Sequence, residues 1–388
     1  MEAILNICLK DIKSNWVALN NASNGKAAAV IKANSYGVGM IKVAKTLMKA
    51  GCNYFYVANL NEGIQLREEL KSKDIKIAIF EGFLKGSEQS YVRYKLTPII
   101  NNLDQLIRLE KLISQGCKIK AILNIDTGMN RLGFSQSEIN LLISKKELLN
   151  LIEWDFIMSH LANADKMKNK ENVKQLDKIL QFSKIIPNTK LSLANSAGIM
   201  LGSSFCLDQT RPGIGLYGID NYGNNIKLNS KSLKFPLSLH GPIIQIRNVN
   251  VGEKVSYGGV DITKRKSRLA TIGIGYADGW LRLLKPNSSF SIRKKKCSII
   301  GNVTMDSFIL DVTNLKEKSL KEISPINFCI NINGHRKIYI TIDDESNISF
   351  EQNSSQFEIK GSLIELLNLL ATRKLNKNLI FGDTEQAI

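Results

Sequence analysis

The sequence of 388 residues predicts an α/β protein, a (β/α)8 TIM barrel followed by a second, mainly β C-terminal domain. Between residues 27 and 217, short apolar runs alternate with longer segments of helical periodicity, which is typical of parallel α/β folds. Eight such runs can be distinguished, and eight is the number of strands in the barrel. After Gly218 the pattern changes to short β-type runs separated by turn signals.

The expected strands are the short apolar runs, and the expected helices lie between them. A doubly wound open sheet is the alternative. Against it, no Gly-x-Gly-x-x-Gly motif follows the first strand, and the candidate functional residues are spread over many strand ends. The predicted strands are 27–31, 54–58, 75–80, 97–100, 119–125, 152–159, 191–194 and 213–217. The predicted helices are 12–24, 41–50, 61–71, 103–115, 135–149 and 168–186.

Two domains are expected because the chain is longer than a usual single core. We place the barrel at residues 1–234 and the mainly β domain at 235–388. Residues 1–10 alternate enough to form a strand, and packing of this strand on the β domain is left open. The β domain is expected to contain strands at 243–251, 269–274, 297–300 and 308–312, a poorly patterned stretch at 315–358 and an amphipathic helix at 363–370.

The composition, with 44% apolar and 23% charged residues, is ordinary for a soluble globular protein. No apolar run approaches the ~20 residues of a membrane span, and the N-terminus lacks the basic-then-apolar order of a secretory signal. We therefore expect a cytoplasmic protein with no membrane partner. The six cysteines are scattered and only three histidines are present, so neither a disulfide framework nor a metal site is expected.

A net charge of +18 raises the question of nucleic-acid binding. However, the lysines are spread over the whole chain, and the densest cluster, 293–296, has no interleaved aromatic residues. Together with the many Asn and Ile residues, this distribution suggests an AT-rich coding bias. We therefore expect no nucleic-acid partner.

Lys32 is the first candidate for chemistry, because it directly follows the first apolar run and precedes Tyr36, Gly37 and Gly39. A lysine amine condenses with an aldehyde cofactor only when it is neutral, so its pKa must be lowered by burial or by a nearby cation. A strand exit offers both, and the two glycines permit a sharp turn close to a ligand. We predict that Lys32 carries a cofactor as a Schiff base. The alternative is a snorkelling lysine beside an ordinary glycine turn.

Further polar residues follow the later strands, at the end of the barrel where catalytic residues lie. Arg131 belongs to the segment after the fifth strand, His160 follows the sixth, and Asn195 and Ser196 follow the seventh. His160 either caps its strand as a core residue or lies with its imidazole against an aromatic cofactor ring.

The segment that opens the expected eighth strand has the features of a phosphate cradle. The Ser196 hydroxyl and the backbone N–H groups beside Gly213 and Ile214 are suitable donors for a phosphate after strands seven and eight. The alternative is a tight glycine turn with a buried serine. Arg211 either forms a salt bridge across the barrel or donates to a ring nitrogen. Because a guanidinium cannot accept a proton, it would keep a pyridine nitrogen unprotonated.

Taken in order, these segments resemble the pyridoxal-phosphate-dependent alanine racemases, and the resemblance covers roughly residues 4–314. It implies pyridoxal 5'-phosphate as cofactor, alanine as substrate and a homodimer with shared active sites. In the barrel it is carried by IKANSYGVG (31–39), DTGMNRLGF (126–134), SHLANAD (159–165), ANSAG (194–198) and RPGIGLYG (211–218). In the second domain it is carried by VSYGG (255–259), GYADG (275–279) and GNVTMD (301–306).

The resemblance assigns roles to the residues of the barrel. Lys32 would be the Schiff-base lysine and one catalytic base, His160 would pack on the cofactor ring, and Arg211 would bind the ring nitrogen. The remaining cofactor contacts are implied for Tyr36, Asn195, Ser196, Gly213 and Ile214, mainly to the phosphate.

The resemblance also implies a second base and a substrate site. Tyr257 would be that base, contributed by the β domain of a partner subunit. Arg131 would hold the substrate carboxylate and lower the pKa of the nearby phenol. Tyr276 would flank the entrance, and Met305 and Asp306 would line the substrate site from the partner subunit.

The implied activity is interconversion of L-alanine and D-alanine by two bases on opposite faces of the substrate, which would supply D-alanine for peptidoglycan. One alternative is a broader racemase that also takes serine. The other is a cofactor-binding protein with weak or lost activity, because Leu379 or Ile380 stands where the family has a phosphate-contacting tyrosine. In addition, Asn124 stands where some members have a modified lysine.

Overall fold

The computed structural model describes residues 3–144, 146–219, 232–280, 289–292 and 295–315, together with four short strands further along the chain. The chain divides into two compact units. The barrel unit runs from Leu9 to Pro236, and the β unit joins the residues before Leu9 to those from Leu237 onward. The helix expected at 363–370 and the position of Leu379 and Ile380 lie outside the described residues.

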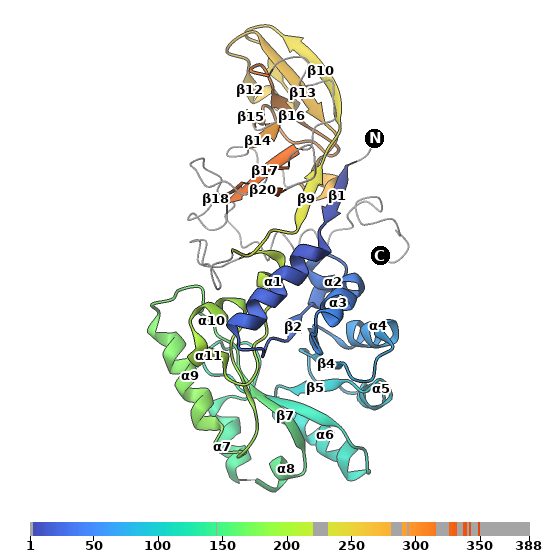
Figure 1. Cartoon of the computed structure of the whole chain (residues 1–388), viewed down its shortest axis with the longest axis vertical. Helices are drawn as coiled ribbons and strands as arrows, with labels where there is room; N and C mark the ends of the chain where they lie inside the picture. Colours follow the sequence, from blue (N-terminus) through green and yellow to red (C-terminus); the bar gives the residue numbers. More distant parts are fainter. Residues whose placement is uncertain are drawn as a thin grey trace. The chain divides into compact units, whose positions relative to one another are not determined.

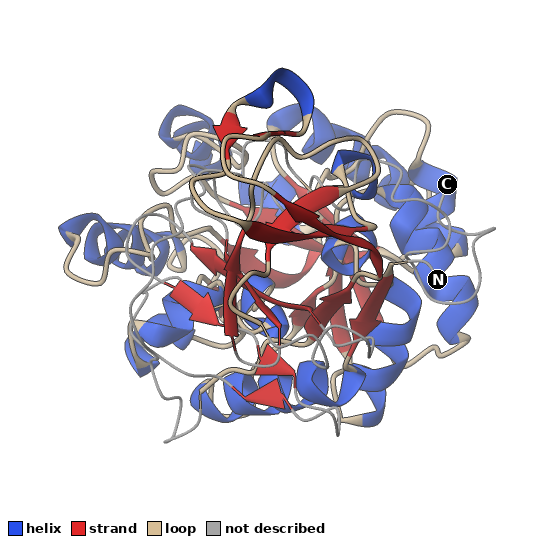
Figure 2. Ribbon diagram, turned by 90° about the horizontal axis from the view of Figure 1, so that it is seen from above, coloured by secondary structure: helices blue, strands red, loops and turns tan. Residues whose placement is uncertain are grey.

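The barrel unit contains a parallel sheet whose seven strands follow one another in sequence order, with the helices on the outside (Figures 1 and 2). A doubly wound sheet would reverse its strand order at a switch point, so this alternative is excluded. The predicted fold class is confirmed. The strands are β2 (Ala29–Val30), β3 (Tyr54–Val57), β4 (Lys76–Ile79), β5 (Thr97–Ile100), β6 (Lys120–Asn124), β7 (Glu153–Met158) and β8 (Leu191–Ser192).

The expected eighth strand at 213–217 is wrong. Its residues form a 3-10 helix, η1 (Ile214–Tyr217), and the preceding segment 209–212 takes the eighth place. Thr210 forms a parallel bridge to Ala27 and Gln209 forms one to Ser192, so this segment joins the last strand to the first. Glycines at 213, 215 and 218 have no side chains with which a strand could pack. The segment 209–212 is polar, so a search for apolar runs does not find it.

The helices between the strands are amphipathic, and in several of them an asparagine caps the first turn. In α3, for example, Met40, Val43, Ala44 and Leu47 are buried along one face. The side chains of Asn59, Asn102, Asn169 and Asn195 accept hydrogen bonds from backbone N–H groups at helix starts. The helices are α1 (Leu9–Ala22), α2 (Lys32–Tyr36), α3 (Met40–Lys49), α4 (Leu60–Leu70), α5 (Glu88–Arg93), α6 (Leu103–Ser114), α7 (Gln136–Ser144), α8 (Lys146–Asn150), α9 (Lys170–Phe182), α10 (Ser196–Met200) and α11 (Ser203–Cys206).

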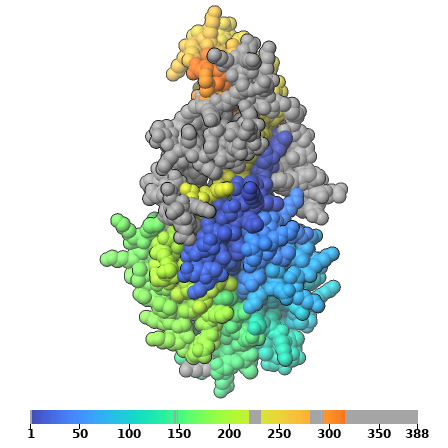
Figure 3. Space-filling view, viewed as in Figure 1, coloured from blue at the N-terminus to red at the C-terminus, as the bar shows by residue number. Residues whose placement is uncertain are grey.

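Helix α1 covers the seam where the first and last segments of the barrel meet. Trp16 Nε1 donates to the carbonyl oxygen of Ala28 at 3.3 Å, beside the first strand. Asn15 Nδ2 donates to the carbonyl oxygens of Leu216 at 3.0 Å and Lys234 at 2.6 Å. Figure 3 shows this helix, in deep blue, between segments from the start of the barrel and segments from near its end.

The interior of the barrel is filled by aromatic side chains. The rings of Tyr54 and Tyr56 stack with centroids 5.1 Å apart, and Tyr56 stacks on Phe80 at 5.4 Å. Lys32 Nζ lies 5.4 Å from the centroid of the Phe80 ring, so the lysine stands over one end of this aromatic column. The barrel is therefore a packed core beneath Lys32.

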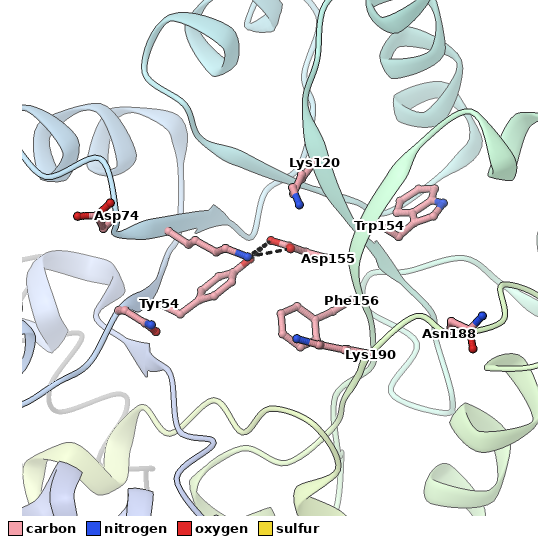
Figure 4. Close-up of a pocket in the computed structure, with 10 residues that line it drawn as sticks. Tyr54, Asp74, Lys120, Trp154, Asp155, Phe156, Asn188 and Lys190 are labelled. Atoms are coloured by element: carbon pink, nitrogen blue, oxygen red, sulfur yellow. Dashed lines mark hydrogen bonds and ion pairs between the residues drawn. The ribbon is translucent and has the colours of Figure 1, made fainter.

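A cavity of about 380 Å³ lies at the other end, where the N-terminal ends of β3, β4, β6 and β7 meet (Figure 4). Lys76 Nζ lies 2.9 Å from Asp155 Oδ1, and the Tyr54 hydroxyl donates to Asp155 Oδ2 at 3.3 Å. Lys120 forms an ion pair with Glu153. Because two of its lysines are matched by carboxylates, this cavity is a poor place for an anionic cofactor.

The β unit is built from small antiparallel sheets. The first strand of the chain, β1 (Ile4–Ile7), pairs with β9 (Leu237–His240). A three-stranded sheet has the order β10 (Ile243–Val249), β13 (Ser267–Ile272) and β16 (Phe308–Asp311), and β11 (Lys254–Val255) pairs with β12 (Asp261–Ile262). The other strands are β14 (Ser289–Ile292), β15 (Lys295–Ser298), β17 (Ile326–Asn331), β18 (Lys337–Tyr339), β19 (Thr341–Ile342) and β20 (Ile348–Ser349).

Candidate functional site

The element labelled α2, which begins at Lys32, is not an ordinary right-handed helix. Ala33, Asn34, Ser35 and Tyr36 have φ angles of 53°, 50°, 59° and 57°, so four consecutive non-glycine residues form a left-handed turn. Each costs roughly 1–2 kcal/mol relative to a right-handed conformation. Such conformations persist only where the surrounding structure holds them, and they cluster at functional sites.

Side chains from three elements hold the left-handed turn. Asn34 Oδ1 accepts from the Met40 amide at 2.9 Å, and the Ser35 and Tyr217 hydroxyls are 2.6 Å apart. The Glu62 carboxylate accepts from the amides of Asn34 at 3.1 Å and Ala58 at 2.8 Å. The turn is therefore tied to α3, α4 and η1, which fixes the backbone next to Lys32.

Burial, and next the Arg131 guanidinium, lower the pKa of the Lys32 amine, while Glu62 opposes them by raising it. A lowered pKa increases the fraction of neutral amine, which is the form that attacks an aldehyde. Lys32 thus has the two influences expected for a Schiff-base lysine, namely burial and a nearby cation.

His160 is held as a neutral imidazole. Burial and the charges of Arg211, Arg131 and Lys32 lower the pKa of His160 to about 3. The side-chain oxygen of Asn195, Oδ1, accepts from the backbone amide of Gly198 at 2.8 Å. The side-chain nitrogen of Asn195, Nδ2, therefore points the other way and lies 3.4 Å from His160 Nε2. Because an amide nitrogen only donates, His160 Nε2 acts as the acceptor.

Arg211 is a buried cation in which one nitrogen, Nε, has no partner among the described residues. Its side chain is 2% exposed, Nη1 donates to the Ser192 hydroxyl, and Nη2 donates to the Ser159 carbonyl at 2.5 Å. Arg211 Nε finds no hydrogen-bond partner among the described residues. A buried, unpaired donor is costly, which indicates that an acceptor outside the described residues belongs there.

Tyr36, Ser196 and Gly213, which are expected to hold a phosphate, lie together. The Ser196 hydroxyl oxygen accepts from the amides of Gly213 and Gly215, both at 3.0 Å, so the Gly213 amide is engaged within the cradle itself. A Cβ atom at Gly213 would stand 2.3 Å from Tyr36 Oη, which shows how closely the phenol approaches this backbone. Ile214 is buried beside them as the first residue of η1.

These residues fit pyridoxal phosphate. A lysine with a lowered pKa suits its aldehyde, an unpaired guanidinium Nε suits its ring nitrogen, and a neutral imidazole suits its aromatic face. Hydroxyls of Tyr36 and Ser196, together with backbone at a glycine, suit its phosphate. Within the described residues, no group of three or more His, Cys, Asp or Glu side chains is placed to hold a metal ion.

Arg131 and Asn124 differ in their surroundings. Arg131 is exposed, yet its charge acts on both Lys32 and His160. Asn124 is 7% exposed and donates through Nδ2 to Asn101 Oδ1 at 2.7 Å. The side chain of Asn124 is therefore engaged with the residue that follows β5.

Gln175 is not among the residues predicted from the sequence. From α9 it donates to Thr127 Oγ1 at 3.0 Å and to the His160 carbonyl at 2.9 Å, and it accepts from the Ala162 amide at 2.9 Å. It ties together the loops that follow β6 and β7. A glutamine on the buried face of a predicted helix is the signal that would have identified it.

The tyrosines predicted in the β unit begin two short 3-10 helices, η2 (Tyr257–Gly259) and η3 (Tyr276–Asp278). Tyr257 is 73% exposed, and its carbonyl accepts from Asn302 Nδ2 at 2.9 Å. Tyr276 donates through its amide to the Thr304 carbonyl at 3.0 Å, next to the exposed Met305 and Asp306. Tyr276 therefore lies beside Met305 and Asp306, and the side chains of Tyr257, Tyr276 and Met305 are exposed.

Two sequence models of known domains match the chain. The model of the alanine racemase N-terminal domain matches residues 7–221, and that of the alanine racemase C-terminal domain matches residues 236–351. In the described part of the chain, no helix has the length and apolarity needed to cross a membrane.

Known proteins resemble the chain over most of its length. An alanine racemase of Brucella canis is 36% identical over 359 residues, which is 90% of each chain. One of Rickettsia bellii is 37% identical over 295 residues, or 76% of this chain and 71% of the other. The crystal structure of the Bartonella henselae alanine racemase, with covalently bound pyridoxal phosphate, has a TM-score of 0.78 at 34% identity and covers 86% of this chain and 91% of its own.

The fold and these matches define a two-domain barrel protein of the kind found in solved racemase structures. The chain belongs to the alanine racemase family.

Proposed function

We propose that the protein interconverts L-alanine and D-alanine with pyridoxal phosphate bound at Lys32. The observation that carries this proposal is the buried guanidinium of Arg211, whose Nε has no partner among the described residues. A ring nitrogen bound by this cation stays unprotonated, which restrains electron withdrawal and favours proton exchange over other reactions of the same cofactor.

Each site residue then has a defined task. When bound, the cofactor withdraws electrons from the α-carbon and makes its proton removable. On one face the neutral Lys32 amine takes this proton, or its ammonium form returns one; on the other face the Tyr257 phenolate takes it, or its phenol form returns one. Arg131 binds the substrate carboxylate. His160 stays neutral and packs on the ring.

The phosphate is held by Tyr36, Ser196 and the backbone N–H of Ile214, while the Gly213 amide holds the Ser196 oxygen and Asn195 caps the helix that Ser196 begins. Because the Ser196 oxygen already accepts two amide hydrogens, its own hydrogen is directed to another acceptor, and a phosphate oxygen suits it.

Two subunits share the site in this proposal. Tyr257, Tyr276, Met305 and Asp306 of the β unit are exposed, and an exposed tyrosine beside a methionine is typical of a surface that meets a partner. Each barrel would receive these residues from the β unit of the second subunit. We place the protein in the cytoplasm, where D-alanine enters peptidoglycan precursors. The free thiols of Cys52, Cys117, Cys206 and Cys297 agree with a reducing compartment.

The test combines a spectrum with an assay. The purified protein with pyridoxal phosphate should show the visible absorbance of a lysine-bound cofactor and should form D-alanine from L-alanine. Lys32→Ala should lose the absorbance, and Tyr257→Phe should keep it while losing most racemisation. Lys45→Ala is the matched control, because Lys45 pairs with Glu69 on the surface. Absorbance that survives in Lys32→Ala, or a fully active monomer in sedimentation, would contradict the proposal.

A further inference from the structure

We propose that Ser192 is a positioning residue, which holds the Arg211 guanidinium so that its Nε meets the ring nitrogen of the cofactor. Ser192 acts through Arg211, and the inference rests on the proposed function. It concerns a hydroxyl on β8 that the sequence motifs do not single out.

The hydrogen bonds of Ser192 fix which way its hydroxyl faces. The side chain is fully buried, and its hydroxyl donates to the Gln209 carbonyl at 2.8 Å. Because this bond uses its only hydrogen, Ser192 Oγ has only lone pairs to offer to Arg211 Nη1, which donates to it. The hydroxyl therefore serves as a dedicated acceptor for the guanidinium.

The other terminal nitrogen of Arg211 is held on the opposite side. Nη2 donates to the carbonyl oxygens of Ser159 at 2.5 Å and Leu193 at 3.4 Å. A guanidinium is planar, so engaging both terminal nitrogens determines the direction of its Nε–H bond. Without the Ser192 acceptor, the group can rotate and present a different donor to the site.

The acceptor itself stands on a rigid support. Gln209 lies in the segment that occupies the eighth strand position, and it forms a parallel bridge with Ser192. Its side-chain Oε1 accepts from the Tyr56 hydroxyl at 2.5 Å, which joins it to the aromatic column of the barrel. Hydrogen bonds thus connect Arg211 to Ser192, Ser192 to Gln209, and Gln209 to Tyr56 in the packed core. These contacts restrict the movement of the Ser192 hydroxyl.

A neutral holder leaves the charge of Arg211 intact. No carboxylate of the described residues lies within ion-pair distance of its guanidinium. An aspartate at position 192 would also accept from Nη1, but its charge would weaken the field of Arg211 at the ring nitrogen. A serine orients the cation without neutralising it.

The experiment replaces Ser192 in the full-length protein and reads out the cofactor rather than turnover. Ser192→Ala removes the acceptor. Ser192→Cys keeps nearly the same volume but accepts hydrogen bonds poorly, which separates the hydroxyl from its packing. Ser87→Ala is the matched control, because Ser87 is a buried serine of the same unit that donates to Leu84 and does not contact Arg211.

Two quantities are measured for each protein, the dissociation constant of pyridoxal phosphate by equilibrium dialysis and the visible spectrum from about pH 6 to 9. We expect Ser192→Ala and Ser192→Cys to bind the cofactor roughly tenfold more weakly or worse, as loss of a hydrogen bond to a charged group predicts. Their spectra should change with pH, because a ring nitrogen without its cation takes up a proton. Ser87→Ala should match the wild type, with a spectrum that does not change.

The outcomes separate the explanations. If both Ser192 variants bind the cofactor within about threefold of wild type and keep a constant spectrum, Ser192 does not position Arg211. If only Ser192→Ala differs, packing explains the effect and the inference is overturned. A wild-type protein that never shows a lysine-bound cofactor would defeat the proposed function and this inference together, whereas the first two results leave the proposed function standing.

Discussion

Replacing Gly213 by alanine tests the close approach between the eighth segment and Tyr36. A Cβ atom at this position would lie 2.3 Å from Tyr36 Oη, 3.2 Å from Tyr36 Cζ and 3.4 Å from Val30 Cβ. The phenol cannot yield easily, because Tyr36 is 9% exposed, belongs to the left-handed turn and packs against Tyr217 with ring centroids 5.0 Å apart. The extra carbon must therefore displace either the tyrosine or the cradle.

Overpacking of this kind costs about 1–3 kcal/mol. For a unit of this size, the midpoint of thermal unfolding falls by ~2–4 °C for each kcal/mol. We expect Gly213→Ala to lower this midpoint accordingly, and to weaken binding of pyridoxal phosphate, because Tyr36 Oη is moved from the phosphate position. Circular dichroism melts measure the first effect and equilibrium dialysis measures the second.

The companion variant is Tyr36→Phe, which deletes the oxygen that the new methyl group would strike. In that background the closest remaining contact of the Cβ atom is 3.2 Å, to Tyr36 Cζ, and a shift of a few tenths of an ångström relieves it. Gly213→Ala should then cost less by about 1 kcal/mol or more, which is a measurable coupling energy. Strictly additive effects of the two substitutions on stability would refute the assigned clash.

Two further predictions concern residues around His160. Gln175→Ala should lower the free energy of unfolding by about 1–3 kcal/mol, because it leaves the buried hydrogen-bond partners of Gln175 unsatisfied. The control is Gln136→Ala, at an exposed glutamine, which should change stability little. Equal thermal melts of the two variants would contradict the role of Gln175. The pKa of His160 falls from 6.5 to about 3 on folding, so between these pH values only the unfolded state takes up a proton. The free energy of unfolding therefore has the full contribution of His160 above pH 6.5 and loses up to about 1.4 kcal/mol for each pH unit as the pH falls toward 3. His160→Gln should make the decline of unfolding free energy below pH 6.5 shallower, and an unchanged slope would show that His160 titrates normally.

The seven strands β2–β8 were predictable because most of their residues are apolar and buried, even though β4, β6 and β7 each begin with an exposed charged residue. The eighth position was not, because the segment from Gln209 to Pro212 is held by backbone bridges and carries polar side chains toward its neighbours. The apolar Ile214–Tyr217 resembled a strand, but its flanking glycines and the Ser196 hydroxyl turn it into a helix.

The placement of the candidate residues at strand exits followed from the order of strands alone. What the sequence could not supply are contacts between distant elements. The left-handed turn depends on Glu62 and Tyr217, which are remote from it in sequence. Glu62 lies in no motif, and Tyr217 belongs to RPGIGLYG (211–218) without a role assigned to it from the sequence. From the sequence, Ser192 is only part of a predicted apolar strand. Its hydrogen bond from the Arg211 guanidinium is visible only in the structure.

The left-handed turn after Lys32 has a stereochemical consequence. Residues Ala33–Tyr36 occupy the region of backbone space that is the mirror image of the ordinary helix, and this is the region that D-amino acids prefer. A polypeptide with D-alanine at position 33 would relieve strain that the natural L-residue must bear, by roughly 1–2 kcal/mol. The protein is proposed to make D-alanine. Next to Lys32, its own backbone has a conformation that a D-alanine residue would adopt with less strain than an L-alanine residue.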